Sequence, residues 1–325
     1  MSKTADGFDI IGDVHGCAEK LERLLHKMGY SDASGAWIHP TRQAVFVGDF
    51  IDRGPDQLGA VKIPKAMVEA GSALAVIGNH EFNAASMATK DPSGEWNREH
   101  SEKNLNHTKK FREAVGFGSD LHAEIVDWFM TLPLWLDLDG IRVVHACWHE
   151  PSMRVLDPWL SATGSLTAEL LVEANIRDTP AFDAIEIVLK GPEAELAGYH
   201  YEDKDGVSRD HGRVSWWDPS ATTLRSGIRL SPSWPVFDPA GNGVEKLPNS
   251  PLPVGLSGIT QTDPQRSPVV FGHYWFTAGK DNETLEVIDT KAACTDFSAV
   301  NDGPLVAYRW SGESELTSDN LTPST

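Results

Sequence analysis

Three apolar stretches in the first quarter of the chain each end in a short polar motif. They read FDIIGDVHG from Phe8, AVFVGDFIDRG from Ala44 and ALAVIGNHEF from Ala73. Short apolar runs bounded by glycine and polar residues are typical of buried strands. In an open α/β sheet the loops that follow the strands converge on one crevice. We therefore expect the three motifs to meet in space although they are far apart in sequence.

Helical patterns separate these runs. After the first motif, CAEKLERLLHKMGY places apolar side chains at helical spacing, and after the second motif a helix is expected from Pro55, because proline suits the first helical turn. The sequence thus predicts β-loop-α units in its first half. The apolar positions of the first helix are Leu21, Leu24, Leu25 and Met28.

The rest of the chain is less regular. LWLDLDGIRVVHACW predicts a hairpin that turns at Asp139-Gly140, and PVVFGHYWF, TLEVIDTK and GPLVAYRW resemble strands of a sheet. Residues 91–112 are polar and predict a surface excursion. Residues 151–265 hold many prolines and tryptophans, which indicates loops and short strands over the main body. Residues 313–325 are expected to form a frayed polar tail.

The polar motifs, together with two isolated histidines in VVHA and VFGHYW, supply side chains that bind transition metals. Carboxylates, an amide oxygen and imidazoles suit Mn, Fe or Zn, with manganese as our first choice for two divalent ions. Two ions roughly 3.5–4 Å apart lower the pKa of a bridging water. We expect one ion to be held by Asp13, His15 and Asp49, and the other by Asp49, Asn79, His145 and His273.

The amino-acid composition limits the classes of molecule that the chain is expected to bind. The chain has 28 Lys and Arg against 47 Asp and Glu, a net charge of −19. This balance disfavours nucleic acids and anionic membranes as partners, and a phosphate site would need local positive charge such as metal ions. We expect no signal peptide and no membrane span, because the most apolar window is interrupted by Asp127, Pro133 and Asp137. Three scattered cysteines exclude a disulfide framework, so a cytoplasmic location is expected.

GDVHG, GDFIDRG and GNHE, followed by the two isolated histidines, resemble the signature of the phosphoprotein phosphatase family of the calcineurin-like metallophosphoesterases, in its bacterial-type branch. The segment ACTDFSAVNDGPLVAYRW is similar to the closing strands of that family. The resemblance covers residues 8–82, 135–149 and 269–310. It implies an α/β, four-layer sandwich in which two mixed β-sheets pack face to face between helices. That fold would form a single domain over residues 1–312, with an insertion at about 151–265.

The resemblance also implies roles for the remaining motif residues. Asp52 would orient His80, which would protonate the leaving oxygen as a general acid, and Arg53 would grip the phosphoryl group in a bidentate fashion. The family usually places a second phosphate-binding arginine within the insertion, and we assign that role to Arg213, just before VSWWDP. Glu81 is expected to be a supporting group. The alternatives to Arg213 are Arg225, Arg229 and Lys190.

We therefore expect a metal-dependent phosphoric ester hydrolase in which a metal-bridging hydroxide attacks a phosphate monoester directly. A serine/threonine protein phosphatase, or one with dual or tyrosine specificity, is the first interpretation, so the substrate would be a phosphorylated protein or a small phosphate ester. The alternative is a hydrolase of dinucleoside polyphosphates such as diadenosine tetraphosphate. A non-catalytic phosphate-binding scaffold is disfavoured because every motif residue is present. The sequence indicates no oligomeric state.

Overall fold

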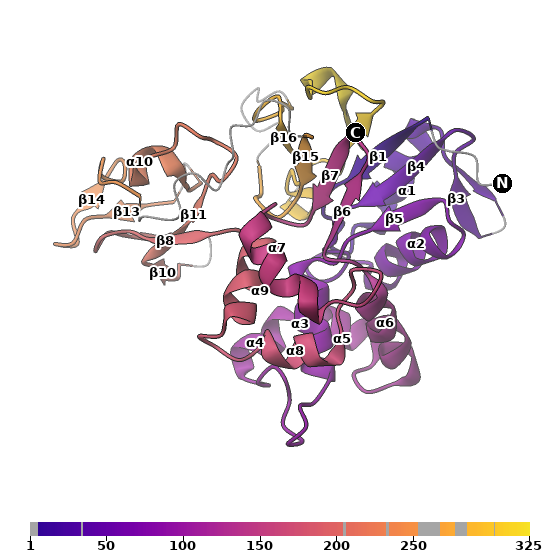
Figure 1. Cartoon of the computed structure of the whole chain (residues 1–325), viewed down its shortest axis with the longest axis horizontal. Helices are drawn as coiled ribbons and strands as arrows, with labels where there is room; N and C mark the ends of the chain where they lie inside the picture. Colours follow the sequence, from indigo (N-terminus) through magenta and orange to yellow (C-terminus); the bar gives the residue numbers. More distant parts are fainter. Residues whose placement is uncertain are drawn as a thin grey trace. The chain divides into compact units, whose positions relative to one another are not determined.

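The computed structural model describes residues 6–33, 35–203, 206–231, 234–252, 267–276, 285–301 and 303–325. The chain divides into two compact units, shown in Figure 1. The first unit comprises Met1–Leu189 and Ser267–Thr325, and the second comprises Lys190–Arg266.

The larger sheet of the first unit has five strands in the order β18-β17-β1-β4-β5. Strands β1, β4 and β5 are parallel, whereas β17 runs antiparallel to β1 and β18 antiparallel to β17. Ile10, Val45 and Phe46 are fully buried, as expected of parallel strands covered on both faces. The strands are β1 (Gly7–Ile11), β4 (Arg42–Phe46), β5 (Ala73–Ala75), β17 (Val306–Trp310) and β18 (Leu321–Pro323).

The second sheet of this unit has four strands in the order β16-β15-β7-β6. The hairpin between β6 and β7 is confirmed, and Asp139 and Gly140 at its turn have φ of 23° and 113°. Both large sheets are mixed, as predicted, and they contact each other where His145 Nδ1 lies 2.7 Å from the carbonyl oxygen of Val47. The strands are β6 (Trp135–Leu138), β7 (Ile141–Val144), β15 (Val269–Phe271) and β16 (Ala292–Cys294).

Helices lie around these sheets (Figure 1). The first helix buries the four predicted apolar positions and ends at Gly29, whose φ of 95° is accessible to glycine. The second helix begins after Asp56, which accepts a hydrogen bond from the Gly59 N–H, so its start lies two residues beyond the predicted Pro55. The helices are α1 (Ala18–Met28), α2 (Gln57–Glu69), α3 (Asn79–Ala88), α4 (Glu102–His107), α5 (Lys109–Val115), α6 (Asp120–Thr131), α7 (Glu150–Leu156), α8 (Ala168–Glu173) and α9 (Pro180–Lys190).

Three predictions from the sequence differ from the structure. Helices α7, α8 and α9 occupy residues that were expected to form loops and short strands, and the second unit starts only at Lys190. The expected tail 313–325 instead adds β18 to the larger sheet, because Leu316 and Leu321 are buried there. Residues 285–291 of the expected strand TLEVIDTK contain a single bridge at Asp289 and no strand, and its first residue, Thr284, lies outside the described residues.

The second unit is built from two small antiparallel sheets, of strand order β12-β11-β8 and β10-β9-β13-β14. A separate apolar cluster that includes Leu196, Val214 and Leu224 forms its core. No helix among the described residues of the chain has the length and apolar character needed to cross a membrane. The elements of this unit are β8 (Glu193–Glu195), β9 (His200–Glu202), β10 (Ser208–Arg209), β11 (His211–Val214), α10 (Leu224–Gly227), β12 (Ile228–Arg229), β13 (Val236–Phe237) and β14 (Gly243–Val244).

Candidate active site

The predicted motif residues of the first unit lie at the carboxyl ends of its strands. The loop after β1 carries Asp13 and His15, and the loop after β4 carries Asp49, Asp52 and Arg53. Asn79 and His80 begin α3, His145 directly follows β7, and His273 lies two residues after the end of β15. All of these side chains are buried except those of His80 and Arg53, which are partly exposed. The buried residues are Asp13, His15, Asp49, Asp52, Asn79, His145 and His273.

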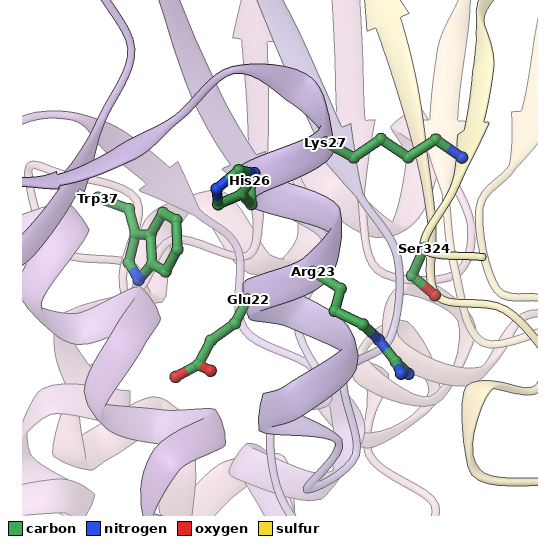
Figure 2. A pocket seen from close by; sticks show the side chains of 6 residues that line it. All are labelled: Glu22, Arg23, His26, Lys27, Trp37 and Ser324. Atoms are coloured by element: carbon green, nitrogen blue, oxygen red, sulfur yellow. The ribbon is translucent and has the colours of Figure 1, made fainter.

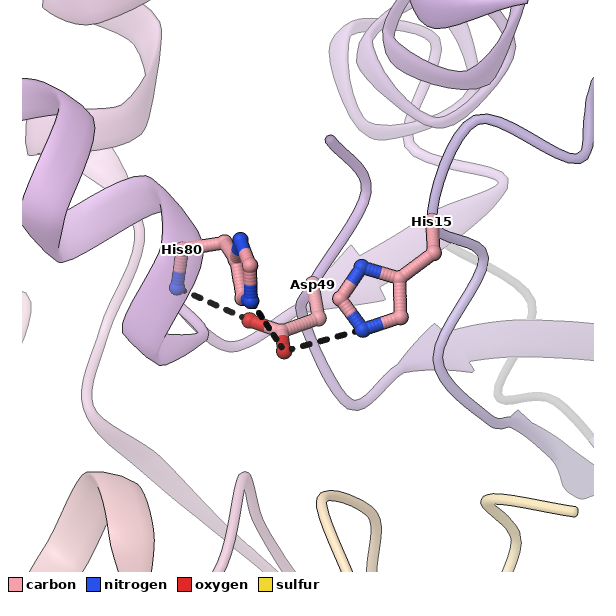
Figure 3. A group of neighbouring side chains, drawn as sticks. All are labelled: His15, Asp49 and His80. Atoms are coloured by element: carbon pink, nitrogen blue, oxygen red, sulfur yellow. Dashed lines mark hydrogen bonds and ion pairs between the residues drawn. The ribbon is translucent and has the colours of Figure 1, made fainter. Parts of the chain in front are cut away.

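Asp49 is the centre of a first group of possible metal ligands (Figure 3). Its Oδ2 lies 3.4 Å from His15 Nε2 and 3.9 Å from His80 Nε2. The backbone N–H of His80 donates a hydrogen bond to the other oxygen of Asp49 at 2.9 Å. One carboxylate thus faces two imidazoles that come from different loops.

A second group shares the same carboxylate and includes His145 and His273. His145 Nε2 lies 3.5 Å from Asp49 Oδ1 and 3.0 Å from the amide oxygen of Asn79. The backbone N–H of His273 donates to both oxygens of Asp13, at 3.1 and 3.3 Å. Asp49 therefore belongs to both groups, and Asn79 adjoins the second through its amide oxygen. Asp13 is a member of neither group and adjoins the second through the His273 backbone N–H, whereas the first includes His80, which was expected to be an acid and not a ligand.

Backbone carbonyl oxygens hold the inner ring nitrogens of two site histidines. His15 Nδ1 donates to the Ile51 carbonyl oxygen at 2.8 Å, and His145 Nδ1 donates to the Val47 carbonyl oxygen at 2.7 Å. The Nε2 atoms then carry lone pairs, and both face the carboxylate of Asp49. Among the described residues His15 Nε2 has no hydrogen-bond partner. A cation bound between these atoms would offset the repulsion of acceptors that face each other at this distance.

Burial explains the electrostatics of the cluster. It raises the pKa of Asp13 well above its usual range, with further contributions from the nearby carboxylates of Asp296 and Asp49. Burial and the charge of Arg53 lower the pKa of His15, which favours its neutral, metal-binding form. Buried carboxylates that repel one another and neutral imidazoles together form a donor set that fits divalent ions of the Mn, Fe and Zn type.

The loops that carry the ligands have unusual backbone geometry. His15, Asp49, Asp52, Arg53 and His273 have φ between 42° and 68°, a region that residues other than glycine rarely adopt. Such conformations cost about 1–3 kcal/mol each and persist only where surrounding structure enforces them. They are typical of functional loops.

Glu81 is one of the groups that enforce this geometry. Its fully buried carboxylate accepts hydrogen bonds from the backbone N–H groups of Asp49, Phe50, Ile51 and Gly78, at 2.8–3.3 Å. Burial and the adjacent charge of Asp49 raise the pKa of Glu81 to about 8. Both oxygens of Glu81 point at the backbone of the ligand loop, which fits the expectation of a supporting group.

His80 and Asp52 form a close pair beside the ligand cluster. His80 Nδ1 lies 2.7 Å from Asp52 Oδ2, while Nε2 points toward Asp49. Burial by itself lowers the pKa of His80, but the charges of Asp49 and Asp52 outweigh it and raise the pKa above its ordinary value. A protonated Nε2 at the edge of the ligand cluster can donate a proton to a leaving group.

Two neighbours of Arg53 were missed in the sequence. The Arg53 guanidinium carbon lies 4.0 Å from the centroid of the Trp275 ring, and the backbone N–H of Trp275 donates to Asp296 Oδ2 at 3.0 Å. Trp275 follows His273 by two residues, and Asp296 lies in the ACTDF segment. Both positions are close in sequence to matched motifs, but no local pattern pairs either of them with Arg53.

Arg213 lies on β11 in the second unit, so its predicted role at the site stays a prediction. Within that unit its Nε lies 3.9 Å from Glu193 Oε1. The alternative Arg225 donates to the Leu247 carbonyl oxygen. Arg229 lies on β12, opposite Arg213 in the backbone register of β11 and β12. Lys190 is the last residue of α9.

A shallow pocket of about 440 Å³ in the first unit lies along α1 (Figure 2) and is lined by none of the expected site residues. Next to it, Lys27 Nζ donates to the carbonyl oxygens of Pro323 and Thr325 and so ties the segment after β18 to α1. The lining side chains are Glu22, Arg23, His26, Lys27, Trp37 and Ser324.

Curated relatives match only part of the chain. The asymmetrical bis(5'-nucleosyl)-tetraphosphatase PrpE of Oceanobacillus iheyensis is 51% identical over 73 residues, which are 22% of this chain and 29% of that protein. The protein of the same name from Halalkalibacterium halodurans is 47% identical over 74 residues, 22% of this chain and 30% of its own length. The chain thus matches less than a third of the length of these relatives.

Structural comparison supports the fold. A protein serine/threonine phosphatase from Saccharomyces cerevisiae superposes with a TM-score of 0.52 over 99% of this chain and 79% of its own, at 13% sequence identity. The family model described as calcineurin-like phosphoesterase matches residues 8–193, more than half of the chain. Together with the cluster at the strand ends, this match shows that the chain belongs to the calcineurin-like phosphoesterase family.

Proposed function

We propose that the protein hydrolyses phosphate monoesters, with phosphorylated serine, threonine or tyrosine side chains of proteins as the substrate class. The observation that carries this proposal is the pairing of His80 with Asp52 beside the shared carboxylate of Asp49. A partly exposed imidazole with a raised pKa is suited to protonating a poor leaving group, and an alkoxide is such a group.

The residues of the site would have three roles in this reaction: metal binding, phosphoryl binding and proton donation. Asp13, His15 and Asp49 would hold one divalent ion, and Asp49, Asn79, His145 and His273 the other, with manganese as our first choice and iron or zinc as alternatives. Bound ions would supply charge neutralisation and an activated water. Arg53 would bind two phosphoryl oxygens, and Asp52 would hold His80 so that Nε2 donates its proton to the leaving oxygen.

A second candidate is the hydrolysis of dinucleoside polyphosphates. The identity of short segments to enzymes named bis(5'-nucleosyl)-tetraphosphatase favours it. In that reaction the leaving group is a nucleotide phosphate, which is stable as an anion at neutral pH and needs little help from an acid. The net charge of −19 also repels a polyanionic substrate at long range.

The two candidates are separated by kcat/KM for a phosphoserine peptide and for diadenosine tetraphosphate, measured with the same manganese-loaded protein. We expect the peptide to be the better substrate and the variant His80→Asn to lose far more activity on the peptide than on the dinucleotide. Faster cleavage of the dinucleotide, with little effect of His80→Asn, would replace the first candidate by the second.

A further inference from the structure

Trp275 and Arg53 form the closest of the cation–aromatic pairs found among the described residues. The Arg53 guanidinium carbon lies 4.0 Å from the centroid of the Trp275 ring. The pair of Lys90 and Trp96, by comparison, is separated by 4.7 Å. Cations within about 6 Å of a tryptophan face are attracted to it, and the attraction strengthens as water is excluded.

The backbone fixes both members of the pair. Arg53 and Trp275 have φ of 64° and 49°, so each lies in a conformation that its loop must enforce. Lys110 Nζ donates a hydrogen bond to the Arg53 carbonyl oxygen, and Asp296 accepts a hydrogen bond from the backbone N–H of Trp275. The other oxygen of Asp296 accepts the Ser298 N–H at 3.1 Å, which holds that carboxylate in place.

The pair also lies at the ligand cluster. Trp275 follows His273 by two residues, and Arg53 follows Asp52, the partner of His80. Trp275 is only partly buried, so the ring does not belong to the apolar core of the unit. The position of the Trp275 ring beside the Arg53 guanidinium therefore fits a role at the site rather than in the apolar core.

We propose that Trp275 is a positioning residue for phosphoryl binding, whose ring holds the Arg53 guanidinium in the orientation that contacts two phosphoryl oxygens. This inference rests on the proposed function of Arg53. An arginine side chain has many rotamers, and a side chain that is oriented before the substrate arrives loses less entropy on binding. Trp275 itself needs no contact with the substrate.

The variants Trp275→Leu and Trp275→Phe test this role, with Trp96→Leu as a matched control. Trp96 also faces a cation but is not a site residue. In the manganese-loaded protein, Trp275→Leu is expected to lower kcat/KM for para-nitrophenyl phosphate about tenfold and to weaken calorimetrically measured binding of inorganic phosphate by a similar factor. Trp275→Phe, which keeps an aromatic face, is expected to recover most of both, and Trp96→Leu to change neither.

A double-mutant cycle separates positioning from general support of the fold. If Trp275 acts through Arg53, Trp275→Leu has little further effect in an Arg53→Ala background. A tenfold loss that persists in that background, or phosphate binding by Trp275→Leu as tight as in the unmodified protein, would overturn the inference. Metal content and circular dichroism check each variant, and Trp275→Met replaces Trp275→Leu if the latter does not fold.

Phosphate binding also distinguishes this inference from the proposed function. A protein without turnover on any phosphate ester would contradict the proposed function. In that case weaker phosphate binding in Trp275→Leu, with normal binding in Trp96→Leu, would still support the positioning role.

Discussion

Replacement of Asp52 by asparagine removes the charge that holds His80. The carboxylate is buried, lies 2.7 Å from His80 Nδ1, and sits in a loop where its φ is 68°. Asparagine has nearly the same shape and tolerates this backbone region, so the loop is expected to keep its conformation. The variant therefore tests the charge of Asp52 rather than its volume.

The size of the effect follows from the hydrogen bond that is weakened. A hydrogen bond to a charged group contributes about 1.5–3 kcal/mol. Loss of the Asp52 charge is therefore expected to lower the pKa of His80. The remaining charge of Asp49 still raises this pKa, which limits the fall.

The sign of the pH dependence is fixed by the role of His80 as an acid. Because the neighbouring carboxylates raise the pKa of His80, the unmodified protein keeps its proton to higher pH than a free histidine would. Its kcat is expected to decline as the pH rises through that pKa. In Asp52→Asn this decline begins at lower pH, and the loss of about 1.5–3 kcal/mol of interaction with the acid corresponds to a fall in kcat of about 10- to 100-fold.

The assay is kcat against pH for a phosphoserine peptide, with Asp56→Asn as the control. Asp56 lies in the same loop and only caps α2, a role that asparagine can fill. The control is expected to reproduce the unmodified profile. An unshifted basic limb in Asp52→Asn, with kcat within about threefold of the unmodified protein, would refute the acid role of the His80–Asp52 pair.

Three further variants test other parts of the account. Glu81→Ala leaves four buried backbone amides without an acceptor, so the free energy of unfolding in urea is expected to fall by at least about 3 kcal/mol; a loss below 1 kcal/mol would mean that Glu81 does not support the ligand loop. Asp9→Ala removes the buried acceptor of the Arg42 and Arg309 guanidinium groups and is expected to lower the free energy of unfolding by about 3–5 kcal/mol, with kcat unchanged because these arginines are not site residues. Gly272→Ala places a Cβ against the Asp13 carboxylate and is expected to weaken metal binding, measured by calorimetry, while unfolding remains cooperative; unchanged metal affinity would contradict the position given to Asp13.

The clustering of the expected metal ligands could be predicted because most of them belong to short sequence motifs. Each motif follows a buried parallel strand, and parallel strands deliver their following loops to one edge of the sheet. The hairpin at Asp139-Gly140 was predictable for a similar reason, because that dipeptide tolerates the φ values which the turn requires.

Other features depend on contacts that no local pattern encodes. Helix α9 has an apolar face formed by Ala181, Ile185, Val188 and Leu189, but the surrounding prolines and tryptophans favoured loops. Strand β18 has only three residues, with no recognisable strand pattern, and it forms because it pairs with β17 over Val306–Tyr308. The pairing of Arg53 with Trp275 joins loops more than 200 residues apart in sequence.

Metal binding tests the central claim most directly. Protein stripped of metal is titrated with Mn²⁺ by calorimetry, and turnover of para-nitrophenyl phosphate is followed as Mn, Fe, Zn or Mg is restored, beside the variant Asp49→Asn. We expect two ions per chain, turnover that depends on them, and loss of turnover with weakened binding in Asp49→Asn, because Asp49 belongs to both ligand groups. Turnover without metal, or metal binding and turnover in Asp49→Asn equal to those of the unmodified protein, would contradict the account.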